Sequence, residues 1–174
     1  MGVVKSVVVY ESHWGSTAAI AQAIAEGMGL DVPALDTDAA DGAALAGVDL
    51  IVAGAPVIAF GLPRLGVRTQ LAGDVKAPQP ADLAHPLLRE WLDGLAPGQG
   101  FGAAFETRIW WSPRGATGTI ESKLRRAGFA RLTKAERFIV AGAYGPLREG
   151  ELERARAWGA TLTRLAAERL ATAV

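Results

Sequence analysis

The sequence predicts a doubly wound α/β fold, in which a parallel β-sheet lies between two layers of helices. Two runs, VVKSVVVY (residues 3–10) and VDLIVAGA (residues 48–55), are β-branched and nearly continuously apolar, as expected of strands buried on both faces. Helical and strand-like patterns then alternate to the end of the chain. This alternation is typical of βαβ units, which build parallel sheets.

The segment between these two runs is expected to hold a helix, an edge strand and a second short helix. The first helix begins near Ser16 or Thr17, because either hydroxyl can cap its N-terminus. Residues 30–36 predict a short strand, which its proline confines to an edge of the sheet. Residues 41–47 predict a short helix or turn.

The middle of the chain is expected to contain two long loops. Residues 61–86 carry four prolines and no sustained apolar period, so we expect a long connection that serves as a lid or mobile segment. A short amphipathic helix is expected at residues 87–95 and a strand at residues 100–105. A second long loop is expected at residues 107–118.

The last third of the chain predicts two helices separated by a strand in two parts. The first of these helices closes at Gly128, and residues 129–132 and 137–142 form the two parts of the strand. The final helix begins at about Glu149, and its acidic first turn and arginine-rich later turns complement the helix dipole. No repeat or domain boundary is visible, so residues 1–174 are expected to form a single domain.

Composition excludes several classes of function. The chain has 18 basic and 18 acidic residues, whereas a nucleic-acid-binding domain usually has a basic surplus. It has no cysteine, which excludes disulfides and thiolate chemistry and leaves any redox function to a borrowed cofactor. No apolar stretch is long enough to span a membrane, and the first residues do not read as a secretory signal. We therefore expect no nucleic-acid or membrane partner. We expect the protein to be located in the cytoplasm.

The loop after the first apolar run, ESHWGST (residues 11–17), is suited to bind an anion. If that strand is central, the loop lies at the carboxyl edge of the sheet, where such folds bind ligands. It leads into a helix N-terminus, which attracts anions, and three hydroxyls come from Ser12, Ser16 and Thr17. A Walker A lysine, a second glycine beside Gly15 and receiver-type aspartates are all missing. The alternative is that the hydroxyls only cap the helix.

The pattern S-x-x-G-S-T resembles the phosphate loop of flavodoxins and flavodoxin-like proteins, which hold the FMN phosphate without a neutralising cation. GAPVIAFGLPR (residues 54–64) resembles the second flavin loop of that family, and FETR (residues 105–108) with the following tryptophans resembles the third. RFIVAGAYGPLREGELERARAWG (residues 137–159) is similar to a segment of bacterial flavodoxin-like proteins. The resemblance implies a five-stranded flavodoxin-like sheet of order 2-1-3-4-5, in a three-layer αβα arrangement.

The resemblance also implies FMN as the cofactor and assigns residues of all three loops to it. The residues expected at the phosphate are Ser12, Gly15, Ser16 and Thr17. Those expected around the ring are Pro56, Ile58, Phe60, Thr107, Trp110 and Trp111. The other loop residues expected to contact the cofactor are His13, Trp14, Val57, Gly61 and Arg108.

Two of the loops depart from the family pattern. Ala55, Val57 and Ile58 stand where hydroxyl or other polar side chains are common. The third loop carries Arg108 and Arg114 where flavodoxins commonly have acidic residues. Positive charge beside the ring would stabilise the reduced, anionic flavin and raise its potential, although a solvated surface position is the expectation for Arg114.

The histidines and the other tryptophans have simpler interpretations. His13 is expected to be an exposed spacer in its loop, and His85 to have no chemical role. Trp14 either covers the phosphate or packs on the long connection. Trp91 and Trp158 lie at core-facing helical positions and are expected to pack in the core. Two distant histidines without a carboxylate pattern argue against a metal site, and no hydrolase motif is present.

Three functions fit these observations. The first is an FMN-dependent electron carrier, a monomer or weak homodimer that serves a redox partner protein. The second is an NAD(P)H-dependent quinone or flavin reductase, in which residues 61–86 form a lid and Arg64 or Arg68 meets a nucleotide phosphate. The third is a flavodoxin-fold protein that has lost its flavin and acts as a binding module.

Overall fold

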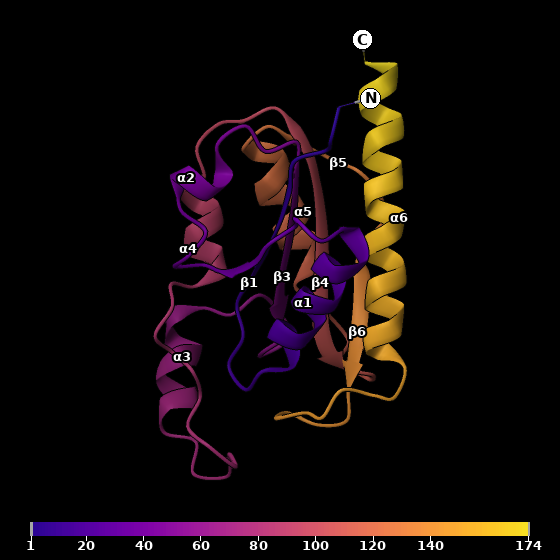
Figure 1. The fold of residues 1–174 in the computed structure, drawn as a ribbon. Helices are drawn as coiled ribbons and strands as arrows, with labels where there is room; N and C mark the ends of the chain where they lie inside the picture. The colour runs from indigo at the N-terminus through magenta and orange to yellow at the C-terminus, as the bar shows by residue number, and fades with distance from the viewer. Residues whose placement is uncertain (1, 174) are drawn as a thin grey trace.

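The computed structural model describes residues 2–173 as one β-sheet with helices on both faces (Figure 1). The strands are β1 (Ser6–Tyr10), β2 (Ala34–Asp36), β3 (Leu50–Pro56), β4 (Gly100–Ile109), β5 (Phe129–Arg131) and β6 (Glu136–Val140). The helices are α1 (Ser16–Met28), α2 (Gly42–Leu45), α3 (Leu65–Ala72), α4 (Leu88–Asp93), α5 (Thr117–Arg126) and α6 (Glu151–Thr172).

The sheet is parallel, with the strand order β2-β1-β3-β4-β5. β5 pairs with the first residues of β4, and β6 pairs with the last five, Phe105 to Ile109. The two short strands therefore share one position in the sheet, which confirms the prediction of a last strand in two parts. The predicted order 2-1-3-4-5 is confirmed as well, and β2, which follows Pro33, lies at an edge as expected.

Side chains of the central strands alternate between two apolar layers, as the pleat of a strand requires. Val8 packs under α1 and α6, whereas Val7 and Val9 belong to the layer beneath α4 and α5. Trp158 is buried in the first layer and Trp91 packs against the second, where its indole Nε1 donates to Ala40 O at 2.8 Å. The core positions predicted for both tryptophans are confirmed.

Helices α1 and α6 lie together on one face and approach closely where each has a glycine. A Cβ atom on Gly27 would overlap the carbonyl oxygen of Arg156, and one on Gly159 would overlap that of Ile24. Neither overlap could be relieved by turning a side chain, because both oxygens belong to the backbone. The glycines therefore set the spacing of this helix pair.

The two predicted loops are shorter than expected. Residues 61–86 contain α3, which has no buried residue and for that reason leaves no apolar period in the sequence. The strand predicted to end at residue 105 continues as β4 to Ile109. Its last part, Glu106 to Arg108, is polar but buried, because its hydrogen-bond partners come from distant segments and from the following loop. α5 begins at Thr117, inside the second predicted loop.

α1 begins at Ser16, as predicted, but no hydroxyl caps it. Gly15 is the N-cap residue, with φ 102°, and no side chain caps the helix. Ser16 and Thr17 are already the first helical residues, so the interpretation of these hydroxyls as helix caps is wrong. Within residues 2–173, no helix combines the length and apolar character that crossing a membrane requires.

Candidate functional site

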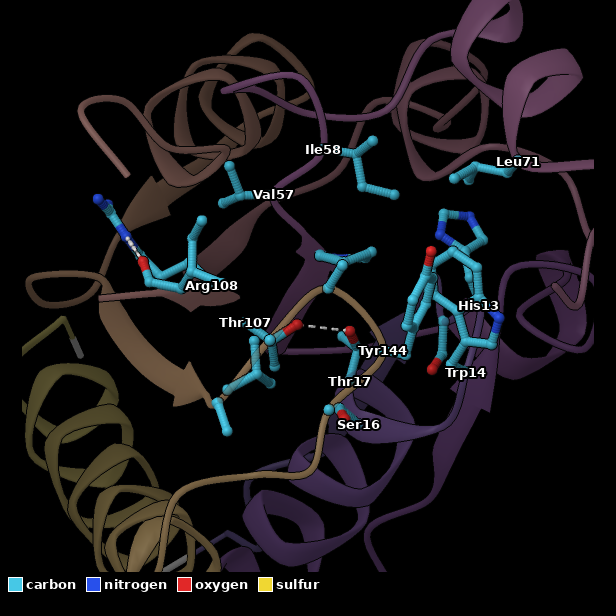
Figure 2. Close-up of a pocket in the computed structure, with 18 of the residues that line it drawn as sticks. His13, Trp14, Ser16, Thr17, Val57, Ile58, Leu71, Thr107, Arg108 and Tyr144 are labelled. Carbon is cyan, nitrogen blue, oxygen red and sulfur yellow. Dashed lines mark hydrogen bonds between the residues drawn. The ribbon is translucent and has the colours of Figure 1, made fainter. Parts of the chain in front are cut away.

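A pocket of about 470 Å³ opens at the carboxyl edge of the sheet, beyond the ends of β1, β3, β4 and β6 (Figure 2). Its walls come from the loops that follow these four strands, and α3 and the turn after it add Leu71 and Asp74. The volume lies in the range of small-molecule sites, about 300–1,000 Å³. Parallel α/β sheets bind ligands at this edge, so the pocket is the leading candidate for a functional site.

One end of the pocket is the N-terminus of α1. The left-handed backbone at Gly15 turns the loop onto the helix, and the Ser12 hydroxyl accepts a hydrogen bond from Gly15 N–H at 3.2 Å. The first turn of α1 has neither a side-chain cap nor an acidic residue. Its free N–H groups and positive dipole end are therefore available to an anion. The hydroxyl-bearing residues Ser12, Ser16 and Thr17 line the pocket here.

Two of the predicted cofactor residues meet at the pocket floor. The hydroxyl oxygens of Thr17 and Thr107 lie 2.8 Å apart and are buried. This hydrogen bond joins the first turn of α1 to the end of β4 (Figure 2). Thr17 therefore already has one hydroxyl partner within the protein.

The opposite wall is apolar and follows β3. Pro56, Val57 and Ile58 line the pocket, and Trp111 from the β4–α5 loop lines it as well. Beyond Ile58 the chain reverses in a two-residue turn, in which Ile58 N–H donates to Gly61 O at 3.0 Å and Gly61 N–H to Ile58 O at 3.2 Å. An apolar slot of this kind suits a flat aromatic ring.

The turn carries unusual backbone angles. Ala59 and Phe60 have φ values of 50° and 62°, in the left-handed region that residues with a Cβ seldom occupy. Two-residue hairpin turns require positive φ at both central positions, and Asn-Gly is the usual choice. The turn holds Ala59 at the pocket and displays the Phe60 ring, 43% exposed, beyond it.

Four predicted cofactor residues do not line the pocket: Gly15, Phe60, Gly61 and Trp110. Gly15 shapes the loop from behind, while Phe60 and Gly61 face a neighbouring hollow on the other side of their turn. Trp110 is 73% exposed. The remaining eleven do line it: Ser12, His13, Trp14, Ser16, Thr17, Pro56, Val57, Ile58, Thr107, Arg108 and Trp111.

Arg108 does not bring an uncompensated positive charge to the pocket. Its guanidinium points away from the cavity (Figure 2), donates to Glu106 Oε1 at 3.0 Å and also donates to Ser112 O. Glu106 is fully buried, and its Oε2 accepts from Ala116 N–H at 2.6 Å and Thr117 N–H at 2.9 Å. The expectation that Arg108 raises a flavin potential loses its basis, because the charge is paired.

His13 is buried and is not the exposed spacer that the sequence predicts. Its side chain is only 1% exposed, and its Nε2 lies 2.8 Å from Glu11 Oε2. The other carboxylate oxygen of Glu11 accepts from Leu88 N–H at 2.7 Å. The pair is buried because the segment before α4 covers it, and Asp82 N–H donates to His13 O at 2.8 Å. His13 therefore helps to hold the long connection against the pocket.

Trp14 packs on the long connection, which is one of its two predicted roles, and it also lines the pocket. Its indole Nε1 donates to Gln79 O at 3.1 Å. Its ring meets Tyr144 edge to face at 4.8 Å between centroids. The Tyr144 hydroxyl donates to Asp74 at 2.6 Å, and this bond lowers the pKa of Asp74 and raises the pKa of Tyr144. Trp14 and Tyr144 thus anchor residues 74–79 beside the pocket.

Sequence reasoning missed three groups at this site: Leu71, Asp74 and the turn after β6 that carries Tyr144. The G-A-Y-G stretch after the last strand was a usable signal for Tyr144, because it follows a strand that ends at the same edge. No sequence signal pointed to Leu71 or Asp74, because α3 itself has no periodic apolar pattern.

Arg68 and His85 serve the long connection as well. Arg68 donates to the carbonyl oxygens of Leu83 and His85, and His85 Nε2 lies 3.2 Å from Asp82. The guanidinium of Arg68 is thereby committed to backbone oxygens and is not presented to a nucleotide phosphate. Within residues 2–173, no group of three His, Cys, Asp or Glu residues is arranged to hold a metal ion.

The donor set of the pocket fits FMN. An uncapped helix N-terminus with hydroxyls at one end suits a phosphate, and the apolar wall with Trp111 at the other suits a ring. Three buried polar atoms of the Glu11–His13 pair, Glu11 Oε2 and both ring nitrogens of His13, have no hydrogen-bond partner of good geometry within residues 2–173, although Glu11 Oε2 and His13 Nε2 lie 2.8 Å apart. These buried polar atoms lie next to the pocket that His13 lines.

Comparisons with known proteins support the fold. No protein-family model and no curated protein sequence matches the chain. Among solved structures, a flavodoxin from the domain Archaea is 20% identical with a TM-score of 0.64, covering 94% of this chain and 99% of its own. A WrbA-like flavodoxin from Agrobacterium tumefaciens is 21% identical with a TM-score of 0.62, covering 95% and 98%.

A third similar structure is larger. The rubredoxin oxygen:oxidoreductase of Desulfovibrio gigas is 20% identical with a TM-score of 0.64, and the match covers 96% of this chain but 37% of that one. Strand order, helical layers and these likenesses agree with one another. The chain therefore has the flavodoxin-like fold.

Proposed function

We propose that the protein binds FMN in this pocket and transfers electrons to and from a partner protein. The observation that carries the proposal is that one pocket combines an uncapped helix N-terminus bearing hydroxyls with an apolar wall that includes Trp111. The fold supports the same proposal, because the similar structures include a flavodoxin and a WrbA-like flavodoxin. A cytoplasmic location stays a prediction.

In this proposal the residues of the chain position the cofactor, and FMN supplies the one- and two-electron chemistry. Ser12, Ser16 and the free N–H groups of α1 would hold the phosphate, where the helix dipole offsets its charge. Ile58 and Trp111 would cover the ring and keep water from it. Trp111 remains 56% exposed, so the pocket stays open to a partner on that side.

The proposal is tested by the visible absorption spectrum of the natively purified protein, followed by titration of colourless protein with FMN and riboflavin. We expect tight binding of FMN and much weaker binding of riboflavin, because only FMN carries the phosphate. Equal affinities would show that the α1 end is not a phosphate site. Absence of binding to both would favour the binding-module interpretation, which the missing hydroxyls at Ala55 and Val57 support.

The reductase interpretation has less support from the site. Of the two arginines proposed to meet a nucleotide phosphate, Arg68 is bound to Leu83 O and His85 O, and only Arg64 is exposed. We therefore expect no quinone-dependent oxidation of NADPH above that of free FMN. Turnover at the rates of typical enzymes, about 1 to 1,000 per second, would reverse this ranking.

A further inference from the structure

Exposed aromatic side chains lie beside the proposed cofactor pocket. Trp111 lines the pocket, is 56% exposed and meets Phe60 edge to face at 6.4 Å between ring centroids. Trp110, the preceding residue, is 73% exposed. Large aromatic groups displayed together on a surface mark sites of interaction with other molecules, and tryptophan is enriched in the energetic centres of protein interfaces.

A positively charged surface borders these rings. On the far side of the Ile58–Gly61 turn lies a hollow of about 470 Å³ that Arg64, Arg89 and Arg114 line without any carboxylate. Within residues 2–173 none of the three forms an ion pair with an acidic side chain. The Nε of Arg89 is buried and has no hydrogen-bond partner there. In the part of the chain that the structure describes, these guanidinium groups therefore have no carboxylate within ion-pair distance.

The positive surface extends past Arg114 along α5. A second hollow shares Arg114 and Gly115 with the first, and its other charged lining residues are Glu121, Arg131, Lys134 and Arg137. The two hollows together present six basic side chains and one acidic one. Arg131 lies 3.8 Å from Glu121 and Arg137 lies 3.8 Å from the buried Glu106, so four of the six, Arg64, Arg89, Arg114 and Lys134, form no ion pair within residues 2–173. Because the whole chain has 18 of each sign, its zero net charge conceals a local positive excess at this face.

We propose that this aromatic–arginine face, made by Trp110, Trp111 and Phe60 with the arginines of the two hollows, docks an acidic redox protein. The proposal rests on the proposed function, because the face borders the pocket through which electrons would pass. Aromatic anchors beside arginines have the composition of an interface centre. Uncompensated positive charge attracts a negatively charged partner and speeds its association by about 10- to 1,000-fold at low salt.

The docking partner can be imitated by one protein in two charge states. Cytochrome c is basic, and succinylation of its lysines makes it acidic without changing the haem. The FMN-loaded protein is photoreduced and mixed with each form in a stopped-flow instrument at several ionic strengths. Each ferric haem takes one electron, so two cytochromes reoxidise one fully reduced FMN. We expect the acidic form to react at least about tenfold faster at low salt, with the advantage falling as salt is added.

Charge variants test whether the face is responsible. Arg64→Gln with Arg114→Gln should slow the acidic cytochrome at least about fivefold at low salt. Arg164→Gln with Arg169→Gln, at exposed positions on α6 outside both hollows, should change the rate less than twofold. A faster reaction with native cytochrome c, rates independent of salt, or equal effects of the two variant pairs would each overturn the proposal.

Direct binding separates this proposal from the proposed function. The apoprotein is titrated with the succinylated cytochrome by calorimetry, which needs no flavin. Binding that weakens in the Arg64→Gln, Arg114→Gln variant supports the docking face even if FMN does not bind. Absence of binding, or binding to both cytochrome forms alike, overturns it. A concentration-dependent dimer in sedimentation that Trp110→Ala abolishes would also overturn it, because the occupant would then be a second copy.

Discussion

The hydroxyl oxygens of Thr17 and Thr107 lie 2.8 Å apart on the pocket floor, although they are 90 residues apart in the sequence. Both side chains are buried, so removal of one hydroxyl leaves the other without its partner. This bond joins α1, which would hold the phosphate, to β4, whose following loop carries Trp111. The bond therefore couples the position of the α1 end of the pocket to that of the β4 end.

The Thr17–Thr107 bond can be measured by a double-mutant cycle. Thr17→Val or Thr107→Val alone should lower the free energy of unfolding by about 1–3 kcal/mol, because a buried hydroxyl loses its partner. The double variant should lose less than the sum, by about 1 kcal/mol. Urea unfolding of the four proteins gives these values. Strict additivity would mean that the two hydroxyls do not interact.

Ser16 should discriminate FMN from riboflavin. Its hydroxyl lies in the first turn of α1 and lines the pocket. Ser16→Ala should weaken FMN binding by about 10- to 100-fold, the value of a hydrogen bond to a charged group. Riboflavin binding should change less than about twofold. Ser122→Ala, on α5, is the control and should bind both flavins normally, and a parallel loss of both ligands in Ser16→Ala would place Ser16 away from the phosphate.

Arg108 should be important for stability. Arg108→Met removes the guanidinium that pairs with Glu106 and leaves a fully buried carboxylate held only by Ala116 and Thr117 N–H and the more distant Arg137. Loss of one member of a buried pair costs about 3–5 kcal/mol. Arg125→Met, at an exposed position, should cost less than about 0.5 kcal/mol. Equal stabilities in guanidinium unfolding would show that Arg108 is not needed to compensate Glu106.

Glu151 should contribute to the pH dependence of stability. Burial opposes its ionisation, but hydrogen bonds from Arg154 and from Ile139 N–H outweigh this and hold its pKa below the usual value. A carboxyl whose pKa is lower in the folded chain stabilises the fold above its unfolded pKa, near 4.5, and loses this contribution as the pH falls through the folded pKa.

The variant Glu151→Gln tests this dependence. It should be less stable than the parent protein at pH 7, and the difference should shrink below about pH 4.5, where the parent carboxyl becomes protonated as well. Urea unfolding between pH 3 and pH 7 measures both curves. A difference that stays constant over this range would assign the effect to lost packing and not to charge.

The close approach of α1 and α6 predicts opposite results for two glycines in helices. Gly159→Ala should destabilise the protein by about 1–3 kcal/mol or more, because its Cβ would overlap the Ile24 carbonyl oxygen. Gly118→Ala, in α5, meets no atom within 4 Å and should be neutral or stabilising by up to about 1 kcal/mol. Thermal unfolding of both variants is sufficient, and similar melting temperatures would contradict the close helix contact.

The sequence was informative where the signal is local. β1 and β3 are buried on both faces, so their apolar runs identify them directly. The loop proposed to hold the phosphate could be located because its hydroxyls, its glycine and the helix that follows are adjacent in the chain. In contrast, α3 buries no residue and therefore has no amphipathic pattern by which it could be recognised.

The tertiary structure alone decided the direction and partners of the polar side chains. In the sequence, Glu106 and Arg108 resemble loop residues because they are charged. Their burial in β4 is possible because the fold brings the N–H groups of α5 to Glu106 and the Ser112 carbonyl to Arg108. Tyr144 and Asp74 meet at the pocket although they are 70 residues apart. The sequence by itself predicted the order of the strands, through the family resemblance, and the edge of the sheet at which the pocket lies. Charge pairing depends on contacts between distant segments, and only the folded chain decides those.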